Sequence, residues 1–148
     1  MPEFTVTHHI DAPVEKFWEV LNDFGSISEW SPGVKRSALT SDGPVGEGST
    51  RHCDFAPMGG VDERIEAYTT GERMKINLFA TQKLPISGAI ADFNIASGDG
   101  GTNLTLHYNY TLNLMGRIAK RTTAKQMRSG MEGVAADLQR ESERLAQT

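Results

Sequence analysis

The most restrictive feature of this sequence is a change in hydrophobic period near residue 112. Before it, apolar and polar residues alternate strictly, and the apolar ones are Leu104, Leu106, Tyr108, Tyr110 and Leu112. This period of two predicts a strand with one buried and one hydrated face, as in an antiparallel sheet. After it, apolar residues recur at helical spacing, at Met127, Met131, Val134, Leu138 and Leu145. That spacing predicts a long helix up to the end of the sequence.

The beginning of the sequence contains signals for one strand and two short helices. Residues 4–10 alternate between apolar and polar, which predicts a strand. A short amphipathic helix follows, and Gly25 is expected to close it in the left-handed conformation. Ser26 and Glu29 form a capping-box pattern, which predicts a second helix of one turn ending at Trp30. We expect the break to bend these two helices into a cradle beneath the long helix.

From Val34 to Leu112 the sequence is typical of strands separated by turns. Breakers recur at SDGPVGEG, PMGG, TTGE, LPISG and GDGG, with the spacing of an antiparallel meander. About six strands are expected in this region. A sheet with its helices segregated to one side is an α+β fold, and no linker or repeat divides residues 1–148. We therefore expect a single domain.

Composition excludes several classes of protein. The net charge of −4 argues against general nucleic-acid binding, which requires a basic surface. The single cysteine, Cys53, excludes a disulfide framework and a multi-cysteine metal site, and it favours a reducing, cytoplasmic location. No apolar run approaches the ~20 residues of a membrane-spanning helix, and the first residues do not form a secretory signal. No motif for a metal, phosphate or nucleotide is found, so we expect no cofactor.

One long stretch, IDAPVEKFWEVLNDFGSISEWSPGV, resembles the opening of the START-like, Bet v 1-type (SRPBCC) superfamily. The nearest branch is that of the polyketide cyclase/dehydrase-like proteins. The later segments follow in matching order: VGEGSTRHCDF, GGVDERIEAY, LPISGAIADFNI and GDGGTNLTLHYNY. The resemblance covers nearly the whole chain. It implies a helix-grip fold, in which a curved antiparallel sheet wraps around the C-terminal helix and encloses a cavity for a hydrophobic molecule.

The parity of each strand predicts which side chains face that cavity. In GSTRHCDF the more apolar face carries Cys53 and Phe55 together with Arg51, and in VDERIEAYTT it carries Glu63 rather than Tyr68. In GAIADFNI the apolar face consists of the two alanines, the phenylalanine and the second isoleucine. For ERMKINLFA the sequence does not decide which face points inward, because apolar residues lie on both faces. The residues expected to contact a ligand are Trp30, Cys53, Phe55, Glu63, Phe79, Phe93, Tyr108, Tyr110, Met127, Met131 and Val134.

Glu63 is the one carboxylate on an otherwise apolar face, and two roles are open for it. Hormone-receptor relatives use an acidic residue of an ERLE-like stretch within the cavity, so the resemblance implies ligand contact for Glu63. Alternatively, Glu63 pairs with Arg51, which lies on the same face, because buried charges are normally paired.

Three kinds of function are compatible with these features. The first is a cytoplasmic protein that binds a small hydrophobic molecule, either lipid-like or aromatic. The second, suggested by the nearest branch, is an aromatase/cyclase- or dehydratase-like enzyme acting on a polyketide or related aromatic molecule. Its acid–base chemistry would fall to Glu63, Arg51 and Tyr108, because an apolar cavity raises the pKa of a carboxyl group. The third is a protein–protein adaptor, as among co-chaperone relatives.

The front of the long helix is strongly basic. Its cations fall largely along one face, with no acid among them, and they are Arg117, Lys120, Arg121, Lys125 and Arg128. Positive charge near a helix N-terminus opposes the helix dipole, so helix propensity does not explain this pattern. Two interpretations are open: a hydrated face, or weak attraction of an anionic membrane surface or carboxylated ligand without stable membrane insertion.

Overall fold

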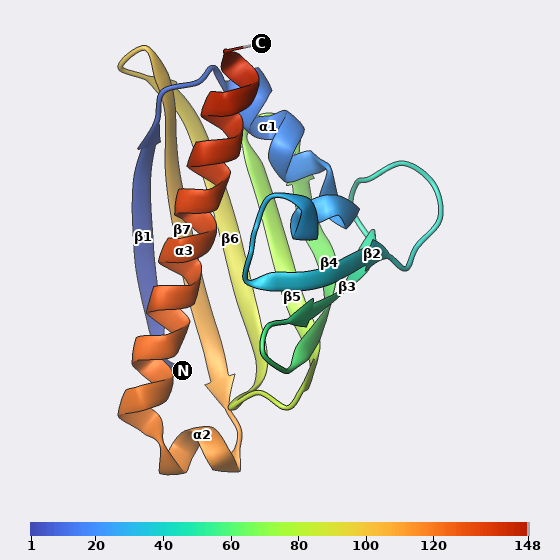
Figure 1. Ribbon diagram of the computed structural model, residues 1–148, viewed down its shortest axis with the longest axis vertical. Helices are drawn as coiled ribbons and strands as arrows, with labels where there is room; N and C mark the ends of the chain where they lie inside the picture. Colours follow the sequence, from blue (N-terminus) through green and yellow to red (C-terminus); the bar gives the residue numbers. More distant parts are fainter. Residues whose placement is uncertain (148) are drawn as a thin grey trace.

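The computed structural model describes residues 1–147 as a curved antiparallel sheet with helices packed on one face (Figure 1). The elements, in chain order, are β1 (Glu3–Ile10), α1 (Val14–Asn22), the 3₁₀ helix η1 (Phe24–Glu29), β2 (Val34–Leu39), β3 (Thr50–Phe55), β4 (Gly60–Thr69), β5 (Arg73–Gln82), β6 (Ile86–Gly98), β7 (Gly101–Leu112), α2 (Leu114–Ile118) and α3 (Lys120–Ala146). The predicted α+β class and the helix-grip arrangement are confirmed.

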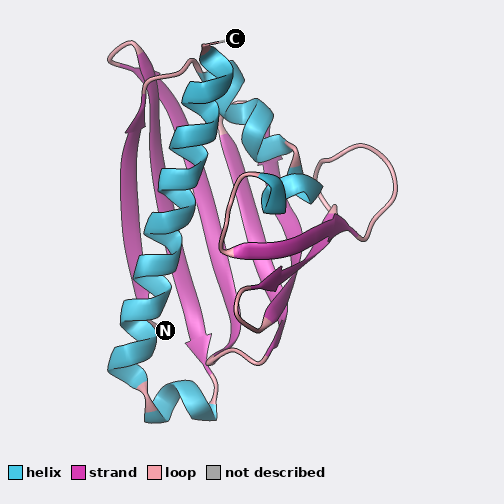
Figure 2. Cartoon of the chain, viewed as in Figure 1, coloured by secondary structure: helices cyan, strands magenta, loops and turns pink. Residues whose placement is uncertain are grey.

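The sheet has the strand order β1-β7-β6-β5-β4-β3-β2, so β2 to β7 form a continuous antiparallel meander. The first strand pairs with the last, from Glu3 opposite Asn109 to Ile10 opposite Thr102. This pairing places β1 at the edge of the sheet beside β7, where it also contacts α3. Figure 2 shows α3 crossing the face of the sheet, where it contacts β1.

The long helix α3 uses its two halves differently. Towards its C-terminal end, Ala135 and Leu138 are fully buried, and α3 contacts both α1 and β1. Towards its N-terminal end, Met127, Met131 and Val134 are only partly buried against the core. Of the five residues of the predicted apolar stripe, Leu138 is fully buried, and Met127, Met131, Val134 and Leu145 are partly buried. The part of α3 that carries Met127, Met131 and Val134 faces an open space above the sheet.

The junction between α1 and η1 differs from the prediction. Gly25 does not close α1, because the helix ends at Asn22 and is followed by Asp23. A Cβ on Gly25 would lie 2.8 Å from the Leu39 Cγ, so glycine is needed for the close approach of β2. The predicted capping box is also wrong: Ser26 lies at a non-helical kink inside η1 (φ −107°), and no side chain caps this helix.

The predicted alternation in β4 holds only up to a β-bulge. Val61, Glu63 and Ile65 are buried on the inner face, as expected. The register then shifts between Ile65 and Ala67. Because a bulge adds a residue to one strand, the facing of the residues beyond it is reversed. Tyr68, predicted to face outward, instead packs edge-on against Trp18 with the ring centroids 5.4 Å apart.

Candidate ligand cavity

A cavity of about 440 Å³ lies between α3, the segment after η1 and the inner faces of β3 to β7. This volume is within the usual range of small-molecule sites, which are about 300–1,000 Å³. Its wall is mostly apolar and includes Leu21, Ile76, Leu78, Ile86 and Leu138. The cavity therefore offers a largely hydrophobic surface to any molecule that enters it.

Nine of the eleven predicted contact residues line this cavity. They come from the end of η1, four strands and α3, and they are Trp30, Cys53, Phe55, Glu63, Phe93, Tyr108, Met127, Met131 and Val134. Period-two parity on the strands and period-3.6 spacing on the helix direct them to the same space. The other two, Phe79 and Tyr110, do not line it.

Phe79 lies on the opposite face of β5. Its side chain is 44% exposed, and the Arg64 guanidinium lies 4.9 Å from the centre of its ring. The inner face of β5 carries Ile76 and Leu78 instead, since Leu78 pairs with the inward-facing Glu63. The sequence did not resolve this strand because both of its faces carry apolar residues.

Tyr110 is buried, but it packs in the core beside the cavity. Its exposed fraction is 2%, and its ring lies 6.2 Å from that of Tyr108, which does line the cavity. Tyr110 therefore lies on the predicted inner face of β7 but outside the lining of the cavity.

Small residues create much of the open space, and sequence analysis placed Ala91 on the inward face but missed the two glycines of α3, because it looked for large apolar side chains. Ala91 on β6 and Gly130 and Gly133 on α3 line the cavity. A Cβ at either glycine would meet no atom within 4 Å. Glycine in a helix interior costs about 1 kcal/mol relative to alanine. Two glycines in one helical turn could therefore have indicated that the helix needs small residues at this place.

The mouth of the cavity lies along one flank of α3. Several cavity-lining residues are also exposed, including Gln126, Ser129 and Gly130 on α3 and Gly33 and Ala56 across from them. The Ala56 amide donates a hydrogen bond to the Gly33 carbonyl oxygen (3.1 Å), which joins the two segments facing the helix. The cavity thus meets solvent between α3 and this pair of loops.

Arg51 and Glu63 form a buried ion pair in the cavity wall. The Arg51 Nε lies 2.7 Å from the Glu63 Oε1, and the side chains are 8% and 9% exposed. The same guanidinium donates to the Phe24 carbonyl oxygen (2.8 Å) and stacks 3.9 Å from the Phe24 ring centre. Both members also line the cavity. The arginine is thus held by η1 and β4 together, and the pair gives the apolar wall one polar region.

Two groups near this pair keep their protons at neutral pH. Burial, as the main cause, raises the pKa of the Cys53 thiol to about 12. Burial also raises the pKa of the Tyr108 hydroxyl, and the negative charge of Glu63 adds to the effect. A thiol with such a pKa is a poor nucleophile. The Tyr108 hydroxyl remains a hydrogen-bond donor.

Two hydrogen-bond donors of cavity-lining residues have no partner among residues 1–147. The Trp30 Nε1 is buried without a hydrogen bond to any of residues 1–147. The Tyr108 hydroxyl likewise has no hydrogen bond to the described part of the chain, and Tyr108 lines the cavity as Trp30 does. Because an unpaired buried donor costs about 1–3 kcal/mol, an oxygen atom of a bound molecule would stabilise the Trp30 Nε1. The Tyr108 hydroxyl could donate a hydrogen bond to such an oxygen as well.

Other kinds of site find no support in the described residues. Within residues 1–147, no group of three or more histidine, cysteine, aspartate or glutamate side chains is arranged to hold a metal ion. In the same range, no helix is long and apolar enough to cross a membrane.

A curved antiparallel sheet closed by a long C-terminal helix over an apolar cavity defines a START-like, helix-grip protein. The family described as "Polyketide cyclase / dehydrase and lipid transport" matches residues 1–143. The chain belongs to this family, whose members commonly bind hydrophobic ligands. The resemblance noted from the sequence is thereby confirmed.

Solved structures of low sequence identity share the fold. The crystal structure of TTHA0849 from Thermus thermophilus is 15% identical, with a TM-score of 0.81 over 95% of this chain and 97% of that chain. A START superfamily protein from Mycobacterium smegmatis is 17% identical, with a TM-score of 0.77 over 97% and 98%. XoxI from Bacillus cereus is 16% identical, with a TM-score of 0.77 over 95% and 94%. No curated protein matches the chain significantly.

Proposed function

We propose that this protein binds a small, largely apolar molecule in the cavity between the sheet and α3. The observation that carries the proposal is the cavity itself, about 440 Å³ with a mostly apolar wall. An empty apolar cavity of this size costs stability, because the side chains around it lose contacts. A ligand that fills the space would restore those contacts.

The polar groups in the wall favour a ligand that carries oxygen atoms on an apolar body. The Trp30 Nε1 and the Tyr108 hydroxyl are donors without a partner in residues 1–147. Both would be satisfied by a carbonyl, ether or hydroxyl oxygen. Glu63, which also lines the cavity, would disfavour a carboxylate placed next to it. Among lipid-like and aromatic ligands, we therefore expect uncharged oxygenated molecules to bind more tightly than their acids.

Native mass spectrometry and ligand titration test this function. The probes are a panel of fatty acids, fatty alcohols and oxygenated aromatic compounds, with retained molecules identified after gentle purification. Gly130→Leu should weaken binding by about tenfold or more, because its side chain enters the open space beside Gly130. The same change should leave the melting temperature unchanged or higher, since leucine is the better helix former.

Ala124→Leu is the matched control, because Ala124 is exposed on the same helix and does not line the cavity. It should bind every probe as the unmodified protein does. Absence of any retained ligand, together with no micromolar binding in the panel, would refute the proposed function. So would equal binding by Gly130→Leu and Ala124→Leu.

A further inference from the structure

Four large apolar side chains lie in solvent at the end of the molecule that carries α2. Leu114, Met115 and Ile118 on α2 are 74%, 60% and 81% exposed, and Met58 in the β3–β4 turn is 61% exposed. We call these four residues the apolar tip. They are four of the seven large hydrophobic side chains that are exposed in residues 1–147. Their gathering at one end therefore sets this surface apart.

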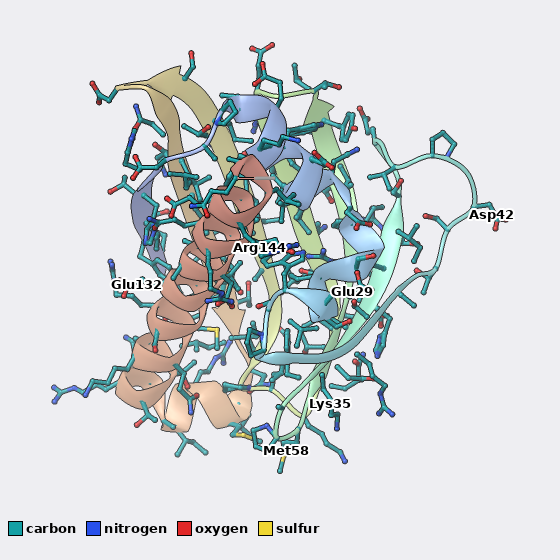
Figure 3. The ribbon with its side chains drawn as sticks, turned by 45° about the horizontal axis from the view of Figure 1, so that its top comes forward. Glu29, Lys35, Asp42, Met58, Glu132 and Arg144 are labelled. Carbon is teal, nitrogen blue, oxygen red and sulfur yellow. The ribbon has the colours of Figure 1, made fainter. Side chains whose placement is uncertain are left out.

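The apolar tip is held together by the β5–β6 turn. Gly116 of α2 is buried so closely against this turn that a Cβ would overlap the Pro85 carbonyl oxygen. From the β3–β4 turn, a Cβ on Gly59 would lie 2.7 Å from the Leu84 side chain. Figure 3 shows Met58 at the same end of the molecule as α2. The helix thus packs through its glycine and presents its large apolar residues outward.

A basic cluster borders the apolar tip. We define it as Arg117, Lys120, Arg121 and Lys125, all of which are exposed. None of the four forms an ion pair with any described residue, and the segment 113–128 contains no acid although the chain carries a net charge of −4. Lys120 and Arg121 also lie in the first turn of α3, where positive charge opposes the helix dipole. This arrangement costs helix stability, and no ion pair within residues 1–147 compensates for it.

We propose that the apolar tip and the basic cluster dock onto the surface of an anionic membrane. Apolar side chains of a surface helix enter the boundary between headgroups and acyl chains, while neighbouring cations meet lipid phosphates. A second copy of the chain fits this surface poorly, because two apolar tips in contact would bring two basic clusters together. The charge of the cluster therefore selects a negative partner.

Docking in this way would place the rim of the cavity against the membrane. Leu84 of the β5–β6 turn lines the cavity and also touches the β3–β4 turn that carries Met58. Ala56, two residues before Met58, lies at the mouth. This consequence rests on the proposed function. A hydrophobic ligand could then pass between the bilayer and the cavity with little exposure to water.

Co-sedimentation with vesicles tests the docking. The intact protein is mixed with phosphatidylcholine vesicles that do or do not contain phosphatidylserine, at low and at high salt. We expect binding to the anionic vesicles that weakens as salt rises. Each basic residue near an anionic surface contributes about fivefold to the partition coefficient. The double variant Arg121→Gln/Lys125→Gln should therefore reduce this coefficient on the order of 20-fold. Ile118→Ser should reduce it about tenfold.

The controls remove similar groups elsewhere on the surface. The double variant Lys16→Gln/Lys75→Gln removes two positive charges, as the test variant does, but from α1 and β5. Phe79→Ser removes an exposed apolar residue from the outer face of β5. Both should bind vesicles as the unmodified protein does. Circular dichroism and thermal unfolding check that each variant is folded.

The outcomes separate this inference from the proposed function. No binding to anionic vesicles, equal binding to neutral and anionic vesicles, or equal loss in the controls overturns the docking. A dimer that Ile118→Ser dissociates, without vesicle binding, assigns the apolar tip to self-association and also overturns it. Ligand titration in solution reports on the cavity alone. If no ligand binds in solution but the protein binds anionic vesicles, the cavity function is refuted and the docking is supported.

Discussion

The Arg51–Glu63 pair shows how one residue can have two roles that sequence analysis treated as alternatives. The carboxylate accepts a 2.7 Å hydrogen bond from Arg51 and also lines the cavity. The Cys53 thiol lies 3.5 Å from the same oxygen. Glu63 is therefore part of the packing of the wall, and a ligand would meet a carboxylate that already has a partner.

Replacing Glu63 tests its structural role. We expect Glu63→Gln to lower the free energy of unfolding by about 2–4 kcal/mol, because a buried guanidinium loses its counter-charge while glutamine keeps one acceptor. Glu66→Gln, which alters a part-exposed pair with Arg64, should cost less than about 1 kcal/mol. Chemical denaturation measures both. Unchanged stability in Glu63→Gln would contradict the structural ion pair and favour a role in ligand contact or catalysis.

His52 on the outer face of the sheet makes stability depend on pH. Its Nδ1 lies 2.7 Å from Asp62 Oδ1 and its Nε2 lies 2.9 Å from Asp54 Oδ1. The hydrogen bond with Asp62, followed by that with Asp54, raises the pKa of His52. A raised folded-state pKa gives stabilisation that is complete below the unfolded pKa and lost as pH rises through the folded value.

A His52→Gln variant measures this contribution. The stability difference between the unmodified protein and the variant should be larger near pH ~6 than near pH ~9. Its change should be at most about 1 kcal/mol, because the side chain is 36% exposed and solvent screens the pair. His107→Gln is the control, since its ring bonds the neutral Thr5 hydroxyl. A difference that stays constant between the two pH values would disprove the coupling.

At the scale of elements, α2 illustrates a short helix held by one side chain and one glycine. Asn113 Oδ1 accepts a hydrogen bond from the Gly116 amide (3.0 Å), and its Nδ2 donates to the Leu84 carbonyl oxygen (2.7 Å). A five-residue helix is not stable alone in water. The orientation of α2, and hence of the apolar tip, depends on these contacts with the β5–β6 turn.

We expect Asn113→Ala to lower the free energy of unfolding by about 1–2 kcal/mol, because the N-cap and the bond to the turn are both lost. Hydrogen exchange should become faster in residues 114–118. Asn109→Ala, on β7, is the control and should change stability by about 0.5 kcal/mol or less. Equal effects of the two substitutions would show that Asn113 does not hold α2.

The position of the break between α1 and η1 was not predictable from local signals. Gly25, Ser26 and Glu29 match known helix-end patterns, yet contacts with β2 decide the outcome. The Ser37 hydroxyl on β2 donates to the Gly25 carbonyl oxygen (2.8 Å) and accepts from the Ser28 amide (3.0 Å). Partners distant in the sequence therefore replace the expected capping box.

At the scale of the whole molecule, the curved sheet and the uneven packing of α3 together produce the cavity. The later part of the helix is anchored by Leu138, which is fully buried, whereas Met131 near its middle is only partly so. Gly130 and Gly133 then leave room on the flank that faces the loops at Gly33. Both the cavity and its mouth thus follow from where α3 is packed and where it is not.

The sequence alone determined the α+β class, the inner faces of most strands and the order of elements except for α2, which was expected to be part of one long helix. These properties follow from hydrophobic period, which is local: each strand or helix has a face that must be buried wherever its partners lie. Parity was therefore sufficient to direct Cys53, Phe93 and Tyr108 towards one interior.

Only the tertiary structure decided the volume of the cavity, the pairing of Arg51 with Glu63, the reversal at Tyr68 and the exposure of α2. Each depends on the distance and register between segments far apart in the chain. A single bulge, or a glycine close to a distant carbonyl group, changes them without changing the period of the sequence.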